Sequence, residues 1–310
     1  MTYIKTIEVK DFFGKGNFHW NLNKSVNIIG GRNGGGKSTL FKACYYLLSD
    51  PQGPQKVDAL MDSIAQSLSI TMTDDTVISW TRNENHWHFV DSLPIVFSSP
   101  IVKVEKSDGE EISLLEFQQK VTANLIASFE QHLSKAIQYE KQPQSVFLED
   151  PSMLDLLIKD QIELRNADFS LFMEKYADDS IENNKARTEY MTQYKQLYTV
   201  LMTFLSDYDD QPKSKFEFTK AGNTFGYDRL SMGEKQILLL LLMVGNTRGE
   251  ECVFFMDEPD LSMHIDWKEK LVTSLNMLNP QMQIILSTHA PSVITGWIDC
   301  VSDMSELFES

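Results

Sequence analysis

The amino-acid sequence predicts an α/β fold with a phosphate-binding loop, an antiparallel β layer and a helical insertion. Three observations support this prediction. A glycine-rich loop, GRNGGGKS (31–38), stands between an apolar strand and a helix. Two further apolar segments, CVFFMD (252–257) and QIILS (283–287), end in polar residues, as buried parallel strands do. The middle of the chain, over 110–208, is helical in pattern and poor in glycine and proline.

The elements follow in order along the chain. Strands are expected in YIKTIEV (3–9) and KSVNIIG (24–30), before the loop and a helix that opens at Lys37. DPQGP (50–54) breaks that helix, and short antiparallel strands follow over 68–99. The remaining expectations are helices over 114–137 and 190–208, strands within 216–227, a helix over 232–244, a strand over 252–257, a helix over about 263–278 and a strand over 283–287. We therefore predict an ATPase-type domain over 1–109 and 211–310, and a compact helical insertion, a lid or short arm, over 110–210.

Length and composition bound the class of protein. The 310 residues, 42% of them hydrophobic, suit one large α/β domain or a domain with a sizeable insertion. The longest aliphatic run, ILLLLLMV (237–244), is far shorter than the roughly 20 residues of a membrane span. The N-terminus lacks the apolar core of a secretion signal. Cys44, Cys252 and Cys300 form no CxxC pair, which favours reduced thiols in a cytoplasmic protein over a zinc site.

The charge distribution favours a protein partner over nucleic acid. The net charge is −16, and residues 101–210 carry 11 Lys and Arg against 21 Asp and Glu. Nucleic-acid binding draws mainly on Lys and Arg to displace counterions, and no local basic patch stands out. The acidic segment could attract a basic protein or keep the chain soluble.

The glycine-rich loop fits the G-x-x-x-x-G-K-[ST] pattern of phosphate loops, also called Walker A. Glycines let the backbone curl with its N–H groups inward, where a Cβ would block a phosphate. Lys37 is expected against the β- and γ-phosphates, and the Ser38 hydroxyl on Mg²⁺. Thr39 adds a donor at the helix N-terminus, near the α-phosphate. The residues expected to bind nucleotide here are Gly31, Arg32, Asn33, Gly34, Gly35, Gly36, Lys37, Ser38 and Thr39.

Polar residues at two strand ends complete a candidate catalytic site. Asp257 is placed to hold Mg²⁺ opposite Ser38, as a Walker B carboxylate does, and Glu258 to take the proton from an attacking water. His289, in STHAP, follows the next apolar strand, at the end of a parallel sheet where ligands bind. It is either a γ-phosphate sensor or, as a lone histidine often is, structural.

The segment LSMGEKQ (230–236) permits two interpretations. Ser231 and Glu234 have the spacing of a helix capping box before an apolar run. The free N–H groups of the same helix start could also face a phosphate, including one held by another molecule.

Taken in order, GRNGGGKS, LSMGEKQ, FFMDEPD and STHAP resemble the ABC-type ATPase heads of the SMC, RecF and OLD groups. The stretch from DEPD to SVI (257–294) is especially similar to OLD-like ATPases of bacterial anti-phage systems. The resemblance covers roughly 1–100 and 216–310. It implies a P-loop NTPase fold of the ABC-head type, ATP and Mg²⁺ as ligands, and hydrolysis of ATP to ADP and phosphate.

The resemblance also implies a head-to-tail pair of protomers. In this family the signature motif of one protomer closes over the γ-phosphate bound by the other. Carried over to this sequence, Ser231 and Gly233 contact that phosphate, with Glu234 behind them, and Asp260 crosses the interface. The alternative is that LSMGEKQ only starts a core helix. A capping box and the clamp are nevertheless compatible with each other, because the same exposed N–H groups serve both.

The sequence departs from the family in several places. Relatives carry a glutamine after the strand that leads into the insertion, whereas IVFSSPIV (95–102) offers Ser98 and Ser99, and Gln118 and Gln119 come much later. OLD proteins carry a nuclease domain after the ATPase, and this chain ends soon after His289. A nuclease or toxin activity is therefore expected in a separate effector protein. Candidate adenine contacts are Lys10, Phe12 and Phe13.

These features predict an ATPase switch subunit that pairs on ATP and controls an effector, in an anti-phage system. The alternative is a DNA-repair or DNA-holding head of the RecF or SMC type. A transporter head is disfavoured, because DLSMHIDWKEK (260–270) and the helical insertion look unlike such heads. No membrane partner is expected.

Overall fold

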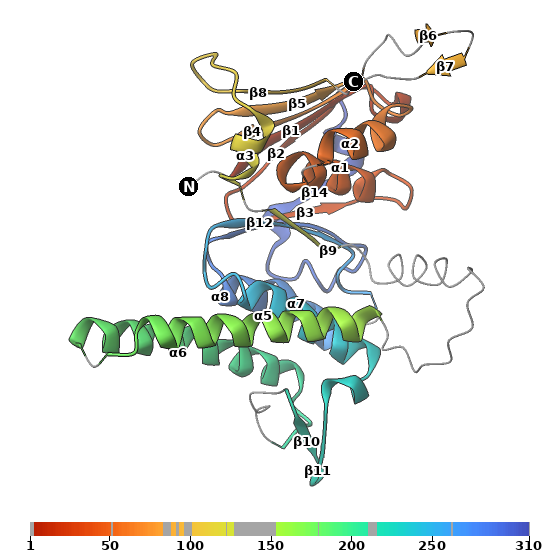
Figure 1. Cartoon of the computed structure of the whole chain (residues 1–310). Coiled ribbons are helices and arrows are strands. Elements are labelled where there is room, and N and C mark those ends of the chain that lie inside the picture. Colours follow the sequence, from red (N-terminus) through yellow and green to blue (C-terminus); the bar gives the residue numbers. More distant parts are fainter. Residues whose placement is uncertain are drawn as a thin grey trace. The chain divides into compact units, whose positions relative to one another are not determined.

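The computed structural model of the chain describes residues 3–50, 52–82, 88–90, 93–95, 101–121, 123–126, 153–178, 180–209, 216–261 and 263–309. The chain forms two compact units (Figure 1). The first comprises Met1–Ala127, Glu251–Pro259 and Met282–Ser310. The second comprises Ser128–Glu250 and Asp260–Gln281.

The first unit contains one antiparallel and one parallel sheet. The antiparallel sheet has the order β2-β1-β4-β5-β8, formed by Phe18–Asn21, Ile4–Lys10, Ser67–Met72, Val77–Thr81 and Ile101–Glu105. The parallel sheet has the order β14-β3-β13-β12-β9, formed by Val301–Asp303, Val26–Gly30, Met282–Ser287, Cys252–Asp257 and Ala123–Ile126. A separate pair, β6 (His88–Val90) and β7 (Leu93–Ile95), is antiparallel. The expected antiparallel layer and buried parallel strands are both present.

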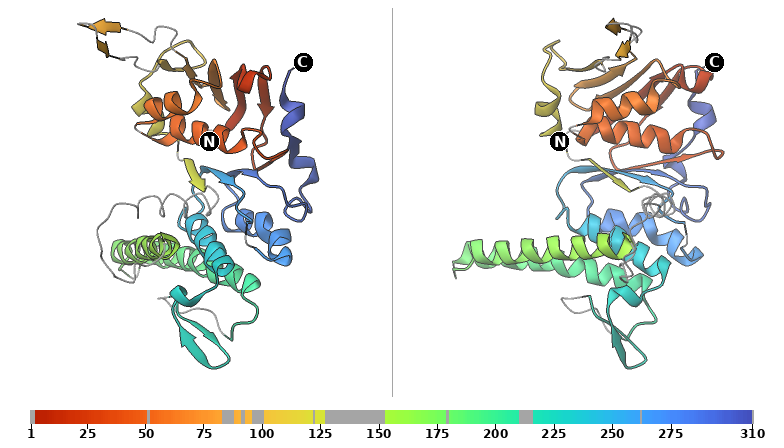
Figure 2. Two further views of the ribbon diagram at one scale, coloured as in Figure 1. Left: turned by 90° about the vertical axis from the view of Figure 1, so that its right-hand side faces the viewer. Right: turned by 45° about the vertical axis from the view of Figure 1, so that its right-hand side comes forward.

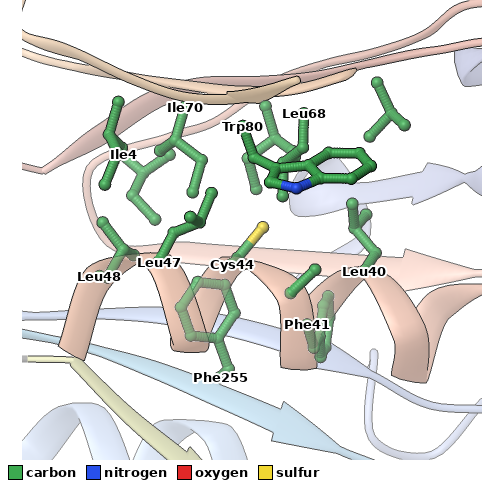
Figure 3. Close-up of a cluster of buried hydrophobic side chains, with 14 of the residues drawn as sticks. Ile4, Leu40, Phe41, Cys44, Leu47, Leu48, Leu68, Ile70, Trp80 and Phe255 are labelled. Carbon is green, nitrogen blue, oxygen red and sulfur yellow. The ribbon is translucent and has the colours of Figure 1, made fainter. Parts of the chain in front are cut away.

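Helix α1 (Lys37–Ser49) lies between the two sheets of the first unit (Figure 3). Leu40, Cys44 and Leu47 are fully buried against the antiparallel sheet, where Trp80 is also fully buried. On the other side of α1, Phe41 contacts Phe255 of β12, with ring centroids 5.7 Å apart. Burying a large apolar side chain contributes about 1.5–3 kcal/mol, so both faces of α1 fix its position and that of the loop before it.

One buried side chain joins the two sheets. Gln283 of β13 is fully buried, and its Oε1 accepts a hydrogen bond of 2.9 Å from the Ile4 N–H of β1. Its Nε2 donates to the carbonyls of Ile4 and Asn23, at 2.9 Å each. All hydrogen-bonding groups of this amide are thus used, as a buried polar group requires.

The predicted helix over 114–137 is wrong for the described residues. Helix α3 covers only Leu114–Gln118, and Ala123–Ile126 forms strand β9 instead. β9 pairs in parallel with Val253–Met256 of β12, and this pairing overrides the helical spacing of the apolar residues. The remainder of that prediction, over 127–137, lies outside the described residues.

The segment after α1 also differs from expectation. DPQGP was expected to break a helix, yet it also starts one, since α2 spans Gly53–Met61 with Pro54 in its first turn. Proline suits that position because the first N–H groups of a helix have no intrahelical partner. Both α1 and α2 pack beneath the antiparallel sheet of the first unit (Figure 1).

The second unit is mainly helical. It contains α5 (Met153–Lys175), α6 (Ile181–Phe204), the hairpin β10–β11 (Phe218–Lys220 and Asn223–Phe225), α7 (Met232–Gly245) and α8 (Ile265–Leu278). α5 and α6 run alongside each other (Figure 2) and are joined by aromatic contacts. The rings of Phe172 and Tyr190, for example, are stacked with their centroids 4.0 Å apart. Both helices pack on α7. The predicted helix over 190–208 is confirmed as part of α6, although α6 ends at Phe204.

The helices, the cysteines and the division into units can be compared with the remaining expectations. No described helix has the length and apolar content needed to cross a membrane. Cys44 and Cys252 are buried. The predicted division at residues 109, 110, 210 and 211 stays a prediction. In the compact units, α3 and β9 fall within the first unit and α7 and α8 within the second.

Candidate functional site

The glycine-rich loop connects β3 to α1 in the first unit. Gly31, Gly34 and Gly36 have φ values of 127°, 73° and 103°, a region that favours glycine. Gly36 is the N-cap of α1, and a Cβ there would lie 2.6 Å from Phe13 Cε2. The loop can therefore take this course only with glycine at these positions, and Asn33 and Arg32 complete the turn.

Lys37, the first residue of α1, folds its ammonium back over the loop. Its Nζ donates hydrogen bonds to the carbonyls of Gly31 (2.9 Å) and Arg32 (3.1 Å) and lies 3.3 Å from His289 Nε2. The residue is only 5% exposed. Burial lowers the pKa of Lys37, although the charges of Glu258 and Asp257 oppose this effect.

Three parallel strands bring their carboxyl ends to this loop. β3 leads into it, and β13 lies between β3 and β12, so that Asp257 at the end of β12 is paired with Ser287 at the end of β13. The Ser287 hydroxyl donates a hydrogen bond of 2.7 Å to Asp257 Oδ1. Asp257 is 2% exposed and Ser287 fully buried. The carboxylate of Asp257 is thus fixed by its neighbour strand.

Glu258 has an unusual backbone conformation. Its φ is 48°, in the left-handed region that is uncommon for residues other than glycine. Its N–H contacts both the carbonyl (3.1 Å) and the hydroxyl oxygen (3.2 Å) of Ser287. These contacts hold the turn after β12, and strain at such a turn is typical of functional sites.

Glu258 and His289 face each other across the end of the sheet. Glu258 Oε1 lies 3.2 Å from His289 Nε2, and the two side chains are 26% and 38% exposed. His289 therefore bridges Lys37 and Glu258, the basic and acidic groups of the site. The predicted catalytic residues Lys37, Glu258 and His289 are brought together by the fold.

The first turn of α1 contains Ser38 and Thr39. The first N–H groups of a helix have no intrahelical acceptor and attract anions. A hydroxyl at Ser38 and a carboxylate at Asp257 are the oxygen donors that Mg²⁺ prefers. The open glycine conformations, the lysine and this donor set fit a Mg²⁺-bound nucleotide phosphate. Within the described ranges, no group of three or more His, Cys, Asp or Glu residues forms a separate metal cluster.

Strand β14 and the residues after it, over 301–308, line a cavity beside the loop. The sequence did not predict that this segment belongs to the site. The cavity is about 980 Å³, within the range of ligand pockets. A Cβ at Gly31 would lie 3.1 Å from Met304 Cβ, so Met304 packs against the loop. Hydrogen bonds from the Ser305 hydroxyl and N–H hold the pKa of Asp303 below its usual range, with the charge of Lys37 contributing. Other lining residues are Lys15, Arg32, Gly35, Thr288, His289 and Phe308.

The candidate adenine contacts are separated by the fold. Phe12 is fully buried, stacks on Phe308 and meets Phe18 edge-on. Phe13 is 37% exposed and lies against Gly36. Lys10 ends β1. Of the three, Phe13 alone has an exposed ring at the loop.

The segment LSMGEKQ (230–236) starts α7 in the second unit as a capping box. Ser231 is the N-cap, its hydroxyl accepts from the Glu234 N–H, and its own N–H donates to Glu234 Oε2 at 2.7 Å. The capping-box interpretation is confirmed. Glu234 also accepts a hydrogen bond of 2.9 Å from the Tyr208 hydroxyl. Burial raises the pKa of Glu234, and the hydrogen bonds from Ser231 and Tyr208 outweigh it, so the net shift is downward.

The remaining predicted positions are Asp260, Gln118, Ser98 and Ser99. Asp260 is 4% exposed and its Oδ2 accepts from Lys268 Nζ at 3.0 Å. Gln118 donates to the carbonyls of Leu47 and Asp50, at 3.0 Å each, and so closes the end of α1. Ser98 and Ser99 lie outside the described residues. The strand that enters the parallel sheet before the helical segment is β9, not the one over 95–102.

A family model described as "AAA domain, putative AbiEii toxin, Type IV TA system" matches residues 26–295. The chain belongs to this family. The match spans the loop, the segment LSMGEKQ and both strand ends of the site. Membership makes the chain an ATPase-family protein with a P-loop NTPase fold, as the sequence predicted.

Two relatives of this AAA-domain protein are informative. A "Retron Vc95 probable ATPase" from Vibrio cholerae serotype O1 biovar El Tor is 31% identical over 129 residues, which are 36% of this chain. The matched part is 25% of that relative's length. An Smc head, solved bound to the C-winged helix domain of ScpA, has a TM-score of 0.53 and 16% identity, covering 95% of this chain and 92% of that chain. At this identity the Smc head supports the fold alone.

Proposed function

We propose that this AAA-domain protein is a Mg²⁺-dependent ATPase subunit that pairs head to tail on ATP and controls a separate effector protein. The observation that carries the proposal is the meeting of Lys37, His289 and Glu258 at the ends of parallel strands. His289 Nε2 lies 3.3 Å from the ammonium and 3.2 Å from the carboxylate. One histidine therefore contacts both the lysine of the phosphate loop and the carboxylate proposed as the general base.

Each residue has a distinct task in the proposed reaction. The glycine-rich loop and Lys37 bind the phosphates of ATP. Glu258 takes a proton from the attacking water as the bond between the γ-phosphorus and ADP breaks. The single Nε2–H of His289 lies beside that carboxylate and is the group that donates to the γ-phosphate when ATP is bound. Ser38 and Asp257 would hold Mg²⁺, which neutralises charge on the phosphate oxygens.

Pairing would use the start of α7. Ser231 is exposed, and the N–H groups of the first helical turn can serve a phosphate of a second protomer. The hydrogen bond between Tyr208 and Glu234 joins this helix start to the segment after α6. An interaction at Ser231 would thus reach the α5–α6 hairpin within the same unit, which is how nucleotide state would act on a partner.

The control of an effector and the role in anti-phage defence rest on the relatives and on charge. The family description names a toxin–antitoxin system, and one relative is a retron ATPase. The Smc head was solved with a bound protein partner. The acidic segment 101–210 suits a basic protein surface. An effector with nuclease or toxin activity is consistent with all of these.

The second candidate function is a DNA-holding head. The resemblance of the sequence motifs to RecF and SMC heads favours it, whereas the net charge of −16 disfavours it. Duplex DNA binding in the submicromolar range that falls steeply with salt would replace the effector proposal with this one.

The test is the native mass of Glu258→Gln with and without Mg²⁺-ATP, after purification with co-purifying proteins. This variant is expected to bind ATP, to hydrolyse it very slowly and to gain the mass of a whole protomer. Ser231→Arg in the same background is the control, since it is expected to bind ATP without pairing.

The outcomes separate the parts of the proposal. Wild-type hydrolysis rates in Glu258→Gln would remove Glu258 as the base. Pairing that persists in Ser231→Arg would remove the clamp. A mass that ignores ATP in both variants would contradict ATP-driven assembly. A co-purifying protein, absent from a tag-only control, would be the effector to identify.

A further inference from the structure

Arg165 of α5 is a buried cation in the second unit, far along the chain from the residues of the proposed ATPase site. It is only 5% exposed. Its guanidinium carbon lies 3.9 Å from the ring centroid of Tyr194, so the two groups stack. Its Nη2 donates to the Tyr194 carbonyl, and its Nη1 lies 3.4 Å from Asn246 Oδ1. Two of its three nitrogens therefore have partners.

The third nitrogen, Nε, is buried and has no hydrogen-bond partner among the described residues. None of the ion pairs within the described ranges involves Arg165. A buried charge normally has a counter-ion, because leaving it unpaired costs several kcal/mol. Arg165 thus retains both an unused donor and an uncompensated charge.

An acidic side chain on the same helix, Asp168, is already engaged by other groups. Asp168, one turn after Arg165, accepts a hydrogen bond of 2.8 Å from the Tyr190 hydroxyl. Its other oxygen lies 3.0 Å from Arg248 Nη1. The Asp168 charge is therefore compensated by Arg248, and that of Arg165 is not.

A small cavity adjoins Arg165. Its volume is about 80 Å³, and its walls come from α5, α6 and the carboxyl end of α7. Leu164 at its edge is 55% exposed, and Gln193 is also exposed, so the cavity is accessible from solvent. The ring of Tyr190 and the stacked pair of Arg165 and Tyr194 give it flat walls.

We propose that this cavity is a binding site for a single carboxylate group, with Arg165 as its counter-ion. The proposal does not rest on the ATPase function, because all of its residues lie in the second unit, whereas the phosphate loop, Asp257, Glu258 and His289 belong to the first. The source of the carboxylate is either an acidic side chain of a partner polypeptide or a small carboxylic acid.

The local charge favours a monoanion over a phosphate. Arg248 pairs with Asp168 at 3.0 Å and lies 3.9 Å from Glu250. The single charge of Arg165 is therefore the one without an ion-pair partner among the described residues, and one carboxylate neutralises it. A phosphate monoester carries about −1.5 to −2. The carboxyl end of α7, at Gly245 and Asn246, adds a partial negative charge that disfavours a second anionic oxygen. A planar carboxylate also matches the flat walls.

The experiment uses the full chain labelled with ¹⁵Nε-arginine and follows the Arg165 Nε–H signal by NMR. The signal is assigned by its loss in Arg165→Lys. Sodium acetate, the blocked peptide acetyl-Leu-Glu-Leu-amide, sodium phosphate and sodium chloride are titrated at constant ionic strength. A saturable downfield shift with acetate and the peptide is expected, and no saturable shift with phosphate or chloride.

Two variants make the test specific. Gln193→Glu places a carboxylate at the edge of the cavity and is expected to weaken acetate binding about tenfold or more, through competition. Asn166→Asp, which adds the same charge on α5 outside the cavity, is the matched control and is expected to bind acetate like the wild type. Since both positions are exposed, neither change affects folding.

Every outcome bears on the proposal. Peptide binding tighter than acetate binding assigns the site to a polypeptide, and equal affinity assigns it to small carboxylic acids. Shifts of equal size with phosphate or chloride would mean general anion screening and overturn the proposal. So would the absence of saturation by either carboxylate up to about 100 mM, which corresponds to binding weaker than about 1.4 kcal/mol.

Discussion

The Ser287 hydroxyl donates a 2.7 Å hydrogen bond to Asp257 Oδ1. The hydroxyl oxygen of Ser287 also accepts a hydrogen bond of 3.2 Å from the Glu258 N–H. One buried serine on β13 therefore holds two adjacent acidic residues, the proposed metal ligand Asp257 at the end of β12 and the proposed base Glu258 in the turn that follows. Groups that orient a ligand in this way generally change activity 10- to 100-fold when removed.

We expect Ser287→Ala to lower kcat for ATP hydrolysis about 10- to 100-fold, with little change in the Kd for ATP. The reason is that Asp257 and the turn at Glu258 lose their orientation while the phosphate loop is intact. Steady-state hydrolysis and ATP binding measured together check this. Ser302→Ala, which removes a hydroxyl from β14 that contacts Trp20, should leave kcat unchanged. A wild-type kcat in Ser287→Ala would show that the serine is only structural.

Lys37→Ala should weaken ATP binding about 10- to 100-fold, because a hydrogen bond to a charged group contributes roughly 1.5–3 kcal/mol. Lys37→Arg should not restore it, since the planar guanidinium cannot occupy the position between the Gly31 and Arg32 carbonyls. Equilibrium binding of a fluorescent ATP analogue is the measurement. Lys24→Ala removes an exposed lysine of the same unit as a control. Unchanged affinity in Lys37→Ala would rule out the phosphate-loop assignment.

Glu234 predicts a pH-dependent stability. Its pKa in the folded protein is below the ordinary value of 4.5. The stabilisation from its carboxylate is therefore complete above about pH 4.5 and is lost as the pH falls through the folded-state pKa.

Glu234→Gln should lower the free energy of unfolding by about 1 kcal/mol at neutral pH, as loss of a helix cap does. The difference from the wild type should shrink at low pH. Urea denaturation from pH 7 to pH 3 tests this, with Glu174→Gln on α5 as a control for the loss of one charge. A difference that stays constant with pH would contradict the assigned role of the carboxylate.

Phe255→Ala should destabilise the protein by about 3–5 kcal/mol, because it removes a fully buried ring that contacts Phe41 on α1. The resulting cavity lies directly behind the helix that carries Lys37 and Ser38. Ile298→Ala, at a position 72% exposed, should change the free energy of unfolding by less than about 0.5 kcal/mol. Chemical denaturation distinguishes the two. A small effect of Phe255→Ala would mean that the core around α1 repacks.

The sequence was sufficient to predict the loop, the parallel strands that end at Asp257 and Ser287, and the capping box at Ser231. Each has a local signal: glycine spacing, an apolar run or a paired polar spacing. The same motifs predicted the family. His289 was placed correctly at a strand end, where the structure brings it within 3.3 Å of Lys37.

The missed features depend on contacts between distant residues. β9 and β14 are edge strands of four and three residues, and their pairing with β12 and β3 stabilises them. Their sequences alone favour helix or loop. Ser287 carries no signal of its link to Asp257, since sheet register decides it. Arg165 resembles any surface arginine of an acidic helix until its burial is known.

The amide of Gln283 has a consequence for how the first unit opens. Because it hydrogen-bonds the backbone of Ile4 from inside β13, neither sheet can separate from the other without exposing an unsatisfied polar group. Backbone amides of β1 and β13 should consequently exchange with deuterium at similar rates, as a single cooperative opening requires. The strands that bear the proposed catalytic residues would then share the lifetime of the antiparallel layer, and nucleotide binding at one edge would slow exchange across both.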